Sequence, residues 1–149
     1  MDAQVVDKVA DAITTQLAAT FGDEYHYYLE DVEQNLIRPC FTIYALQSRE
    51  RSRSPVLYDR TVPVVVHYFS DKKSGVRKNA YQIAEQVMDC LEYLPFDGSY
   101  LRGENISYMM VDDVLEVFIT YRFRTQKVLV PETNMEELEN TDVSALPNT

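Results

Sequence analysis

The stretch from Tyr100 to Arg124 constrains the fold more than any other part of the chain, because apolar and polar side chains alternate along it. In its second half, one face carries Leu115, Val117, Ile119, Tyr121 and Phe123. The other face carries Glu116, Thr120, Arg122 and Arg124, and Phe118 is its one apolar member. A period of two with one polar face is typical of a half-buried antiparallel strand. With Asp112 and Asp113 as turn residues, the stretch is predicted to form a β-hairpin.

Two other segments have apolar residues at helical spacing. The first runs from Ala3 to Phe21, with an apolar stripe of Val6, Val9, Ile13, Leu17 and Phe21. The second runs from Val76 to Leu94, with a stripe of Val76, Ala80, Ile83, Val87, Leu91 and Leu94. Gly22 follows the first segment, and Pro95 and Gly98 follow the second, as stop signals do. Each stripe is one-sided, so both helices are expected to pack on another layer.

Three further strands are predicted between these helices, at Tyr25 to Leu29, Cys40 to Leu46 and Val56 to Phe69. Pro63 indicates an edge position or a bulge in the third of them, because proline has no N–H for the strand ladder. The intervening segment from Gln47 to Pro55 has no apolar residue before its last position. It is either a loop or the exposed end of a long hairpin.

The predicted element order is therefore α-β-β-β-α-β-β. We expect an α+β fold in which a mainly antiparallel sheet has two helices packed on one face. At 149 residues the chain is predicted to form a single domain over residues 1–130. The remaining residues, 131–149, are acidic and poor in aromatic side chains, so we expect an extended or partly disordered C-terminal arm.

The charge is unevenly distributed along the chain. The formal net charge of −10 disfavours non-specific binding of the whole chain to nucleic acid. Two segments are nevertheless basic, from Arg49 to Arg60 and from Asp71 to Lys78. Separated patches of opposite sign favour association between copies of one chain, although an ordinary solvated surface is the more common outcome.

The arginines of the first basic segment are the candidate interface residues, namely Arg49, Arg51, Arg53 and Arg60. Alternate residues of an extended segment point the same way, so the first three are predicted to form one basic row. Such a row either keeps the tip of a sheet solvated, or contacts a phosphate backbone or an acidic neighbouring subunit. The acidic C-terminal arm is a possible partner for it, within the chain or across an interface.

No motif for catalysis, cofactor binding or metal binding is present in the sequence. It has no GxxxxGK[ST], GxGxxG or HExxH pattern. His26 and His67 stand alone, and Cys40 and Cys90 lack a CxxC partner and are interpreted as reduced, buried thiols. We therefore predict a protein that is not an enzyme, with no catalytic residue, no cofactor and no metal.

Clustered carboxylates leave one enzymatic alternative open. They are Glu30, Asp31, Glu33, Asp112 and Asp113. A small carboxylate-dependent hydrolase would need two such groups in environments that separate their pKa values. The sequence also contains no apolar run long enough to span a membrane and no signal-peptide pattern at its N-terminus, so no membrane partner is expected.

Three segments together resemble a known family. They are VEQNLIRPCF at Val32 to Phe41, the strand at Arg60 to Phe69, and the LRG…VDDVL…Y.F hairpin at Leu101 to Phe123. With the N-terminal helix, they resemble the small tail terminator proteins of phages and prophages of Gram-positive bacteria. The resemblance extends from Ala3 to about Thr125.

The resemblance implies an assembly role. Tail terminators cap the tail tube, end its polymerisation and form a ring, usually of six subunits, that docks to the head-side connector. The expected partners are therefore other copies of the chain, the tail tube protein and the head–tail connector. The sheath protein joins them if the tail is contractile, and DNA is only passing cargo. The expected location is the virion tail, or a headless tail-like particle, after assembly in the host cytoplasm. Another neck or baseplate adaptor of the same particle is the alternative.

Overall fold

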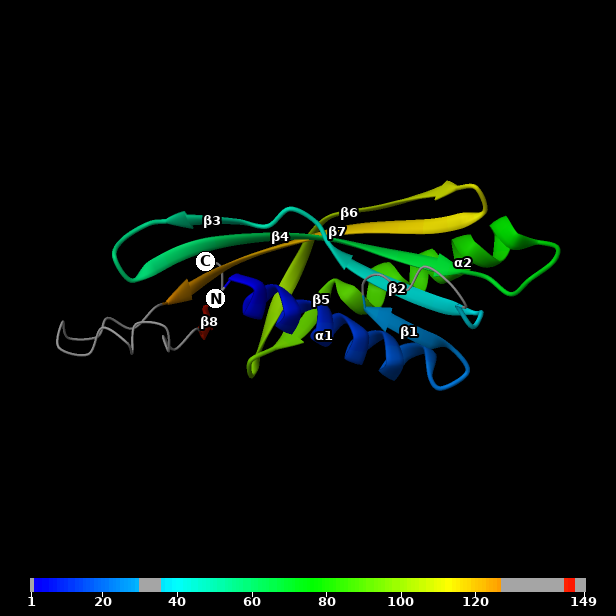
Figure 1. Ribbon diagram of the computed structural model, residues 1–149, viewed down its shortest axis with the longest axis horizontal. Coiled ribbons are helices and arrows are strands. Elements are labelled where there is room, and N and C mark those ends of the chain that lie inside the picture. The colour runs from blue at the N-terminus through cyan, green and yellow to red at the C-terminus, as the bar shows by residue number, and fades with distance from the viewer. Residues whose placement is uncertain (1, 30–35, 127–143, 147–149) are drawn as a thin grey trace.

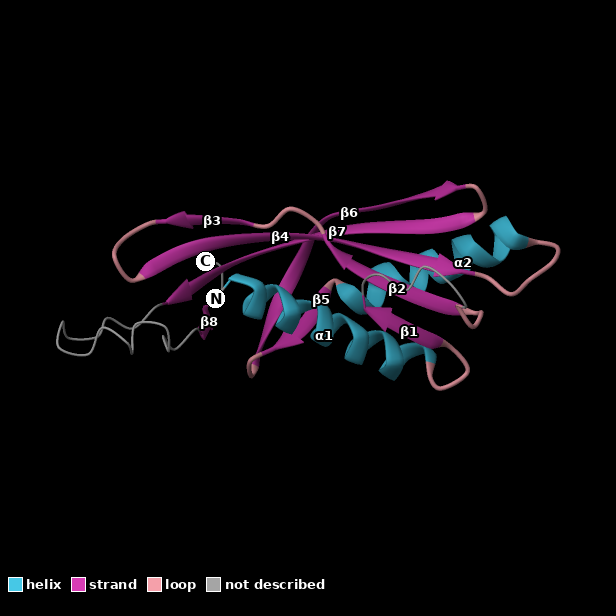
Figure 2. Ribbon diagram, in the orientation of Figure 1, coloured by secondary structure: helices cyan, strands magenta, loops and turns pink. Residues whose placement is uncertain are grey.

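The computed structural model, which describes residues 2–29, 36–126 and 144–146, has two helices on one side of a sheet (Figures 1 and 2). The helices are α1 (Asp2–Phe21) and α2 (Val76–Leu91). The strands are β1 (His26–Leu29), β2 (Cys40–Ala45), β3 (Arg49–Ser52), β4 (Leu57–Phe69), β5 (Tyr93–Phe96), β6 (Ser99–Val111), β7 (Val114–Gln126) and β8 (Ser144–Leu146). The α+β class with helices packed on a mainly antiparallel sheet is confirmed.

The long strands β4 and β7 form the centre of the sheet. The strand order is β1-β2-β4-β7-β6-β5, with β3 paired to β4 and β8 paired to β7. The pairing of β1 with β2 is parallel, and all other pairings among the described residues are antiparallel. The strand at 26–29 therefore lies at one edge, and β5 lies at the other.

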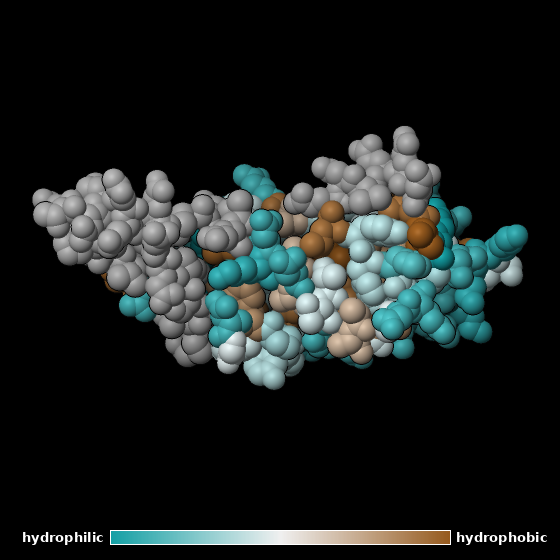
Figure 3. All heavy atoms as spheres, turned by 60° about the horizontal axis from the view of Figure 1, so that its bottom comes forward, coloured by the Kyte–Doolittle hydropathy of each residue, from teal (hydrophilic) through white to brown (hydrophobic). Residues whose placement is uncertain are grey.

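The core lies between the helices and the sheet. All five apolar residues predicted for one face of β7 are buried there, and none exceeds 3% exposure. In α1 the buried stripe is Val5, Val9, Ile13 and Leu17, so Val5 takes the place predicted for Val6. Figure 3 turns the α1 side of the molecule forward, and hydrophilic, intermediate and hydrophobic residues are mixed on its described surface. No helix among the described residues is long and apolar enough to cross a membrane.

An aromatic cluster joins α1, β1, β2 and β4 at one end of this core. The ring of Phe41, which is fully buried, lies at its centre. Its centroid is 4.9 Å from Phe21, 5.1 Å from Tyr68, 5.7 Å from Tyr25 and 5.8 Å from Tyr27. Because aromatic rings contribute large buried areas and favourable tilted contacts, this cluster stabilises the packing of α1 against the sheet.

The predicted hairpin is confirmed as β6 and β7. Its two-residue turn is Asp112 and Asp113, which have φ angles of 49° and 65°. Positive φ at both central residues is the geometry of the type I′ turn that matches the twist of paired strands. Aspartate tolerates this region better than most residues, so the turn forms here without glycine.

The end of the second helix differs from the prediction. Helix α2 ends at Leu91 rather than Leu94, and strand β5 follows at once. In β5 the buried residues Leu94 and Phe96 alternate with exposed Tyr93 and Pro95, which is a strand pattern. The hairpin from β5 to β6 turns at Asp97–Gly98, a pair that strongly favours such turns.

Strand β6 bends away from β7 near its middle. Its register with β7 shifts between Glu104 and Ser107, and Asn105 between them has a φ of 53°. One extra residue in the left-handed region is the signature of a β-bulge, which turns a strand. Before the bulge, Gly103 still pairs with Tyr121 of β7 and donates its N–H to Glu92 O at 2.6 Å, and the preceding residues of β6 pair with β5.

A second irregularity explains Pro63. Between the pairs Ala45–Val64 and Arg49–Thr61, the β2–β3 side contains one residue more than β4. Pro63 accepts a hydrogen bond from Leu46 N at 2.8 Å at this point, so its missing N–H faces the bulge. The bulge alternative of the prediction is confirmed, and the edge alternative is wrong because β4 has neighbours on both sides.

Candidate functional site

Two rows of side chains cross β3, β4 and β7 at one end of the sheet. The strand registers place Arg49, Thr61 and Arg122 in one row, and Arg51, Asp59 and Arg124 in the other. Directly opposed residues of a sheet point to the same face, and neighbouring strands lie about 4.8 Å apart. The two rows therefore form a compact basic surface on the face away from the helices.

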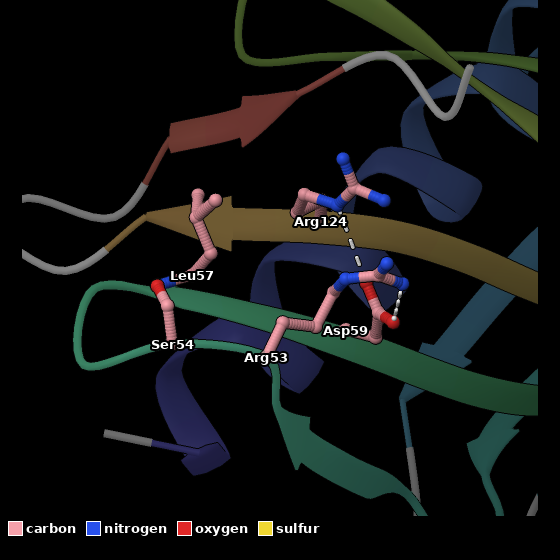
Figure 4. A network of polar contacts seen from close by, with 5 residues as sticks. All are labelled: Arg53, Ser54, Leu57, Asp59 and Arg124. Carbon is pink, nitrogen blue, oxygen red and sulfur yellow. Dashed lines mark hydrogen bonds and ion pairs between the residues drawn. The ribbon is translucent and has the colours of Figure 1, made fainter.

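Asp59 lies at the centre of this surface (Figure 4). Its Oδ2 accepts a hydrogen bond from Arg53 Nη1 at 2.9 Å, and its Oδ1 accepts one from Arg124 Nε at 3.3 Å. The hydrogen bond from Arg53 is the largest cause that holds the pKa of Asp59 below its usual 3.8, and Arg124 adds to it. Asp59 is thus ionised at neutral pH and holds the two guanidinium groups in place.

The turn after β3 fixes the position of Arg53. Arg53 N donates to Leu57 O at 2.8 Å, and Leu57 N donates to Ser54 Oγ at 3.0 Å. Figure 4 shows the Arg53 side chain reaching from this turn across to Asp59. The predicted basic segment is therefore a strand and a turn that belong to one hairpin with β4.

We call this surface the arginine face, and define it as Arg49, Arg51, Arg53, Arg122 and Arg124 around Asp59. It carries five positive charges and one negative charge in a chain whose net charge is −10. It lines a hollow of ≈ 500 Å³. Exposed ion pairs contribute little to stability, and five neighbouring guanidinium groups repel one another.

Arg60, the fourth predicted interface residue, lies apart from the arginine face. Its partner in the register is Glu50, one residue out of phase with both rows, so it points to the helix side of the sheet. Only 3% of its side chain is exposed, and Arg60 Nη1 lies 3.0 Å from Glu50 Oε1. A buried guanidinium needs such a carboxylate, so its place indicates a structural role.

Two members of the arginine face were not among the predicted interface residues. Arg122 and Arg124 lie more than 60 positions beyond Arg53 in the sequence, on the polar face of β7. The alternation of apolar and polar residues along β7 indicated that both arginines point away from the core. Only the pairing of β4 with β7 reveals that they point to the same place as Arg49 and Arg51.

The candidate carboxylates do not form a site among the described residues. Asp112 and Asp113 form an exposed turn at the opposite end of β7 from the arginine face. Glu30, Asp31 and Glu33 lie outside the described residues. Nowhere in 2–29, 36–126 and 144–146 do three or more His, Cys, Asp or Glu side chains group so that they could hold a metal ion.

Comparison with known proteins gives one informative match. A family model described as "Phage tail terminator protein" matches residues 8–133. A search of curated proteins gave no match. One solved structure is similar at 14% identity over 82% of this chain and 97% of the other, with a TM-score of 0.36, which is too low to support an argument.

Proposed function

Because the chain belongs to the phage tail terminator family, we propose that it caps the tail tube and ends its polymerisation. The family is a structural one, and its place is the virion tail. In our proposal the subunits form a ring, with six as the expected number, and the ring presents a docking surface to the head-side connector. In a contractile tail it would also contact the last sheath ring.

The observation that carries this proposal is the arginine face. It is a localised positive surface on the side of the sheet away from both helices, while the chain as a whole is strongly acidic. A closed ring needs a heterologous interface, in which one patch of a subunit meets a different patch of the next. A basic patch on an acidic chain supports such an interface, because the neighbour's acidic surface is its natural complement.

We assign the subunit contact to Arg49, Arg51 and Arg53, together with Arg122 and Arg124. Arginine suits this role because its planar group makes paired hydrogen bonds with carboxylates. The side chain of Arg53 is 52% exposed, so it is accessible to a partner while it remains tied to Asp59. In this proposal DNA passes through the ring only as cargo. Assembly takes place in the host cytoplasm.

Ring formation is the first test. We expect light scattering on the purified protein at increasing concentration to show a mass several times that of the 17.3 kDa chain. Negative-stain electron microscopy should show particles with a central hole. High salt should dissociate them, since screening weakens contacts between exposed charges. A protein that stays monomeric and also fails to bind tail tubes would contradict the capping function. An adaptor role in the same particle would then remain.

A further inference from the structure

Strand β7 has an open edge beside the arginine face. Strand β6 pairs with β7 only as far as Tyr121, and the residues of β6 before Gly103 pair with β5. A hollow of ≈ 850 Å³, lined in part by Tyr100, Arg102 and Arg122, lies between the diverging strands. The backbone of β7 beyond Tyr121 therefore offers hydrogen-bonding groups that β6 does not use, as an edge strand does.

The short strand β8 occupies part of this edge. Arg124, Thr125 and Gln126 pair with Leu146, Ala145 and Ser144, respectively, in antiparallel register. The pairing involves only three residues on each strand, so it contributes few hydrogen bonds. Main-chain pairing of this kind accepts any chain that presents an extended segment, including the same segment from another copy.

The length of the connection allows that exchange. Residues 127–143, which number 17, separate β7 from β8 in the sequence. Two residues suffice to join adjacent antiparallel strands, whereas 17 residues can span up to about 56 Å. A connection of this length reaches a neighbouring subunit as well as its own.

Charge complementarity favours a neighbouring subunit as the source of the strand that pairs with β7. Residues 128–143 contain five carboxylates, at Glu132, Glu136, Glu137, Glu139 and Asp142, and no Lys or Arg. In the sequence this acidic stretch directly precedes β8, whose Leu146 pairs with Arg124 of the arginine face. In a ring, the stretch from one subunit would supply the acidic partner for the arginine face of the next.

We infer that the edge of β7 at Arg124–Gln126 takes β8 from a second copy of this chain, so that neighbouring subunits exchange their last strands. The inference rests on the proposed ring and specifies the contact that joins its neighbouring subunits. Exchange of an identical element between subunits preserves the same contacts, so it costs little beyond the ordering of the connection. It also covers an edge that would otherwise invite non-specific pairing.

A cysteine pair across the two strands tests this inference. Thr125 and Ala145 are directly paired, at a separation that a disulfide can bridge. We would introduce Thr125→Cys and Ala145→Cys together in a Cys90→Ser background, oxidise the assembled protein, and run it on a denaturing gel without reductant. Strand exchange predicts a ladder of covalent oligomers that collapses to monomer on reduction. An equal mixture of the two single variants should give a covalent dimer, which neither gives alone.

A matched pair on neighbouring strands serves as the control. Met109→Cys with Glu116→Cys joins β6 and β7 of one chain and should give only cross-linked monomer. If the Thr125–Ala145 pair also gives only cross-linked monomer while microscopy shows rings, β8 pairs within its own chain and the inference is overturned. A ladder from a protein that forms no rings would support strand exchange and overturn the ring instead.

Discussion

Replacement of Phe41 by alanine is expected to lower the free energy of unfolding by about 3–5 kcal/mol. Its ring is fully buried and touches four other aromatic rings, which come from α1, the connection after it, β1 and β4. Removal of the ring deletes its transfer free energy and leaves a cavity that rigid neighbouring rings fill poorly. A loss of this size is a large part of the total stability of a typical domain.

Urea denaturation monitored by circular dichroism measures this effect. The matched control is Phe118→Ala, which removes the same atoms from the half-buried outer face of β7. We expect the control to lose less than half as much stability, with an unchanged dependence on urea. Equal losses in the two variants would show that the aromatic cluster does not hold α1 on the sheet as described.

Replacement of Arg49, Arg51 and Arg53 together by alanine is expected to weaken subunit association by about 100-fold. The figure follows from the loss of roughly 1 kcal/mol at each of three charged contacts. The folded monomer should change little, because these side chains are exposed on one face of the sheet and surface substitutions usually cost under about 0.5 kcal/mol each. Mass by light scattering and thermal unfolding would report the two effects separately.

Lys72, Lys73 and Lys78 provide the control for net charge, since all three are exposed and lie outside the arginine face. Their combined replacement by alanine changes the charge of the chain by the same amount and should leave association intact. Similar weakening by both triple variants would mean that overall charge, and not the arginine face, governs assembly. Intact rings and completed tails from the arginine variant would refute the assigned interface.

The parts of the fold that follow from local periodicity could be predicted from the sequence. Both helices and the β6–β7 hairpin were predicted in this way, because a stripe of buried residues or an alternation of faces is a property of consecutive residues. Strand β5 was missed because Leu91 and Leu94 continue the helical spacing of α2. The following Asp-Gly turn was the signal that could have separated the two.

The candidate site required information that no local pattern contains. Alternation predicted the row of Arg49, Arg51 and Arg53, but the contribution of Arg122 and Arg124 depends on which strand lies beside β4. Arg60 was grouped with the candidate interface residues by sequence proximity alone. A shift of one residue along a strand moves a side chain to the opposite face, which is why Arg60 lies on the helix side with Glu50.

The length of tail tubes assembled with and without this protein tests the capping function most directly. Tail tube protein would be polymerised alone, with the purified protein, and with the arginine variant, and the lengths would be measured by electron microscopy. A cap predicts shorter tubes with density at one end in the presence of the protein, and uncapped tubes with the variant. Tubes of the same length and with bare ends in all three samples would contradict the proposed function.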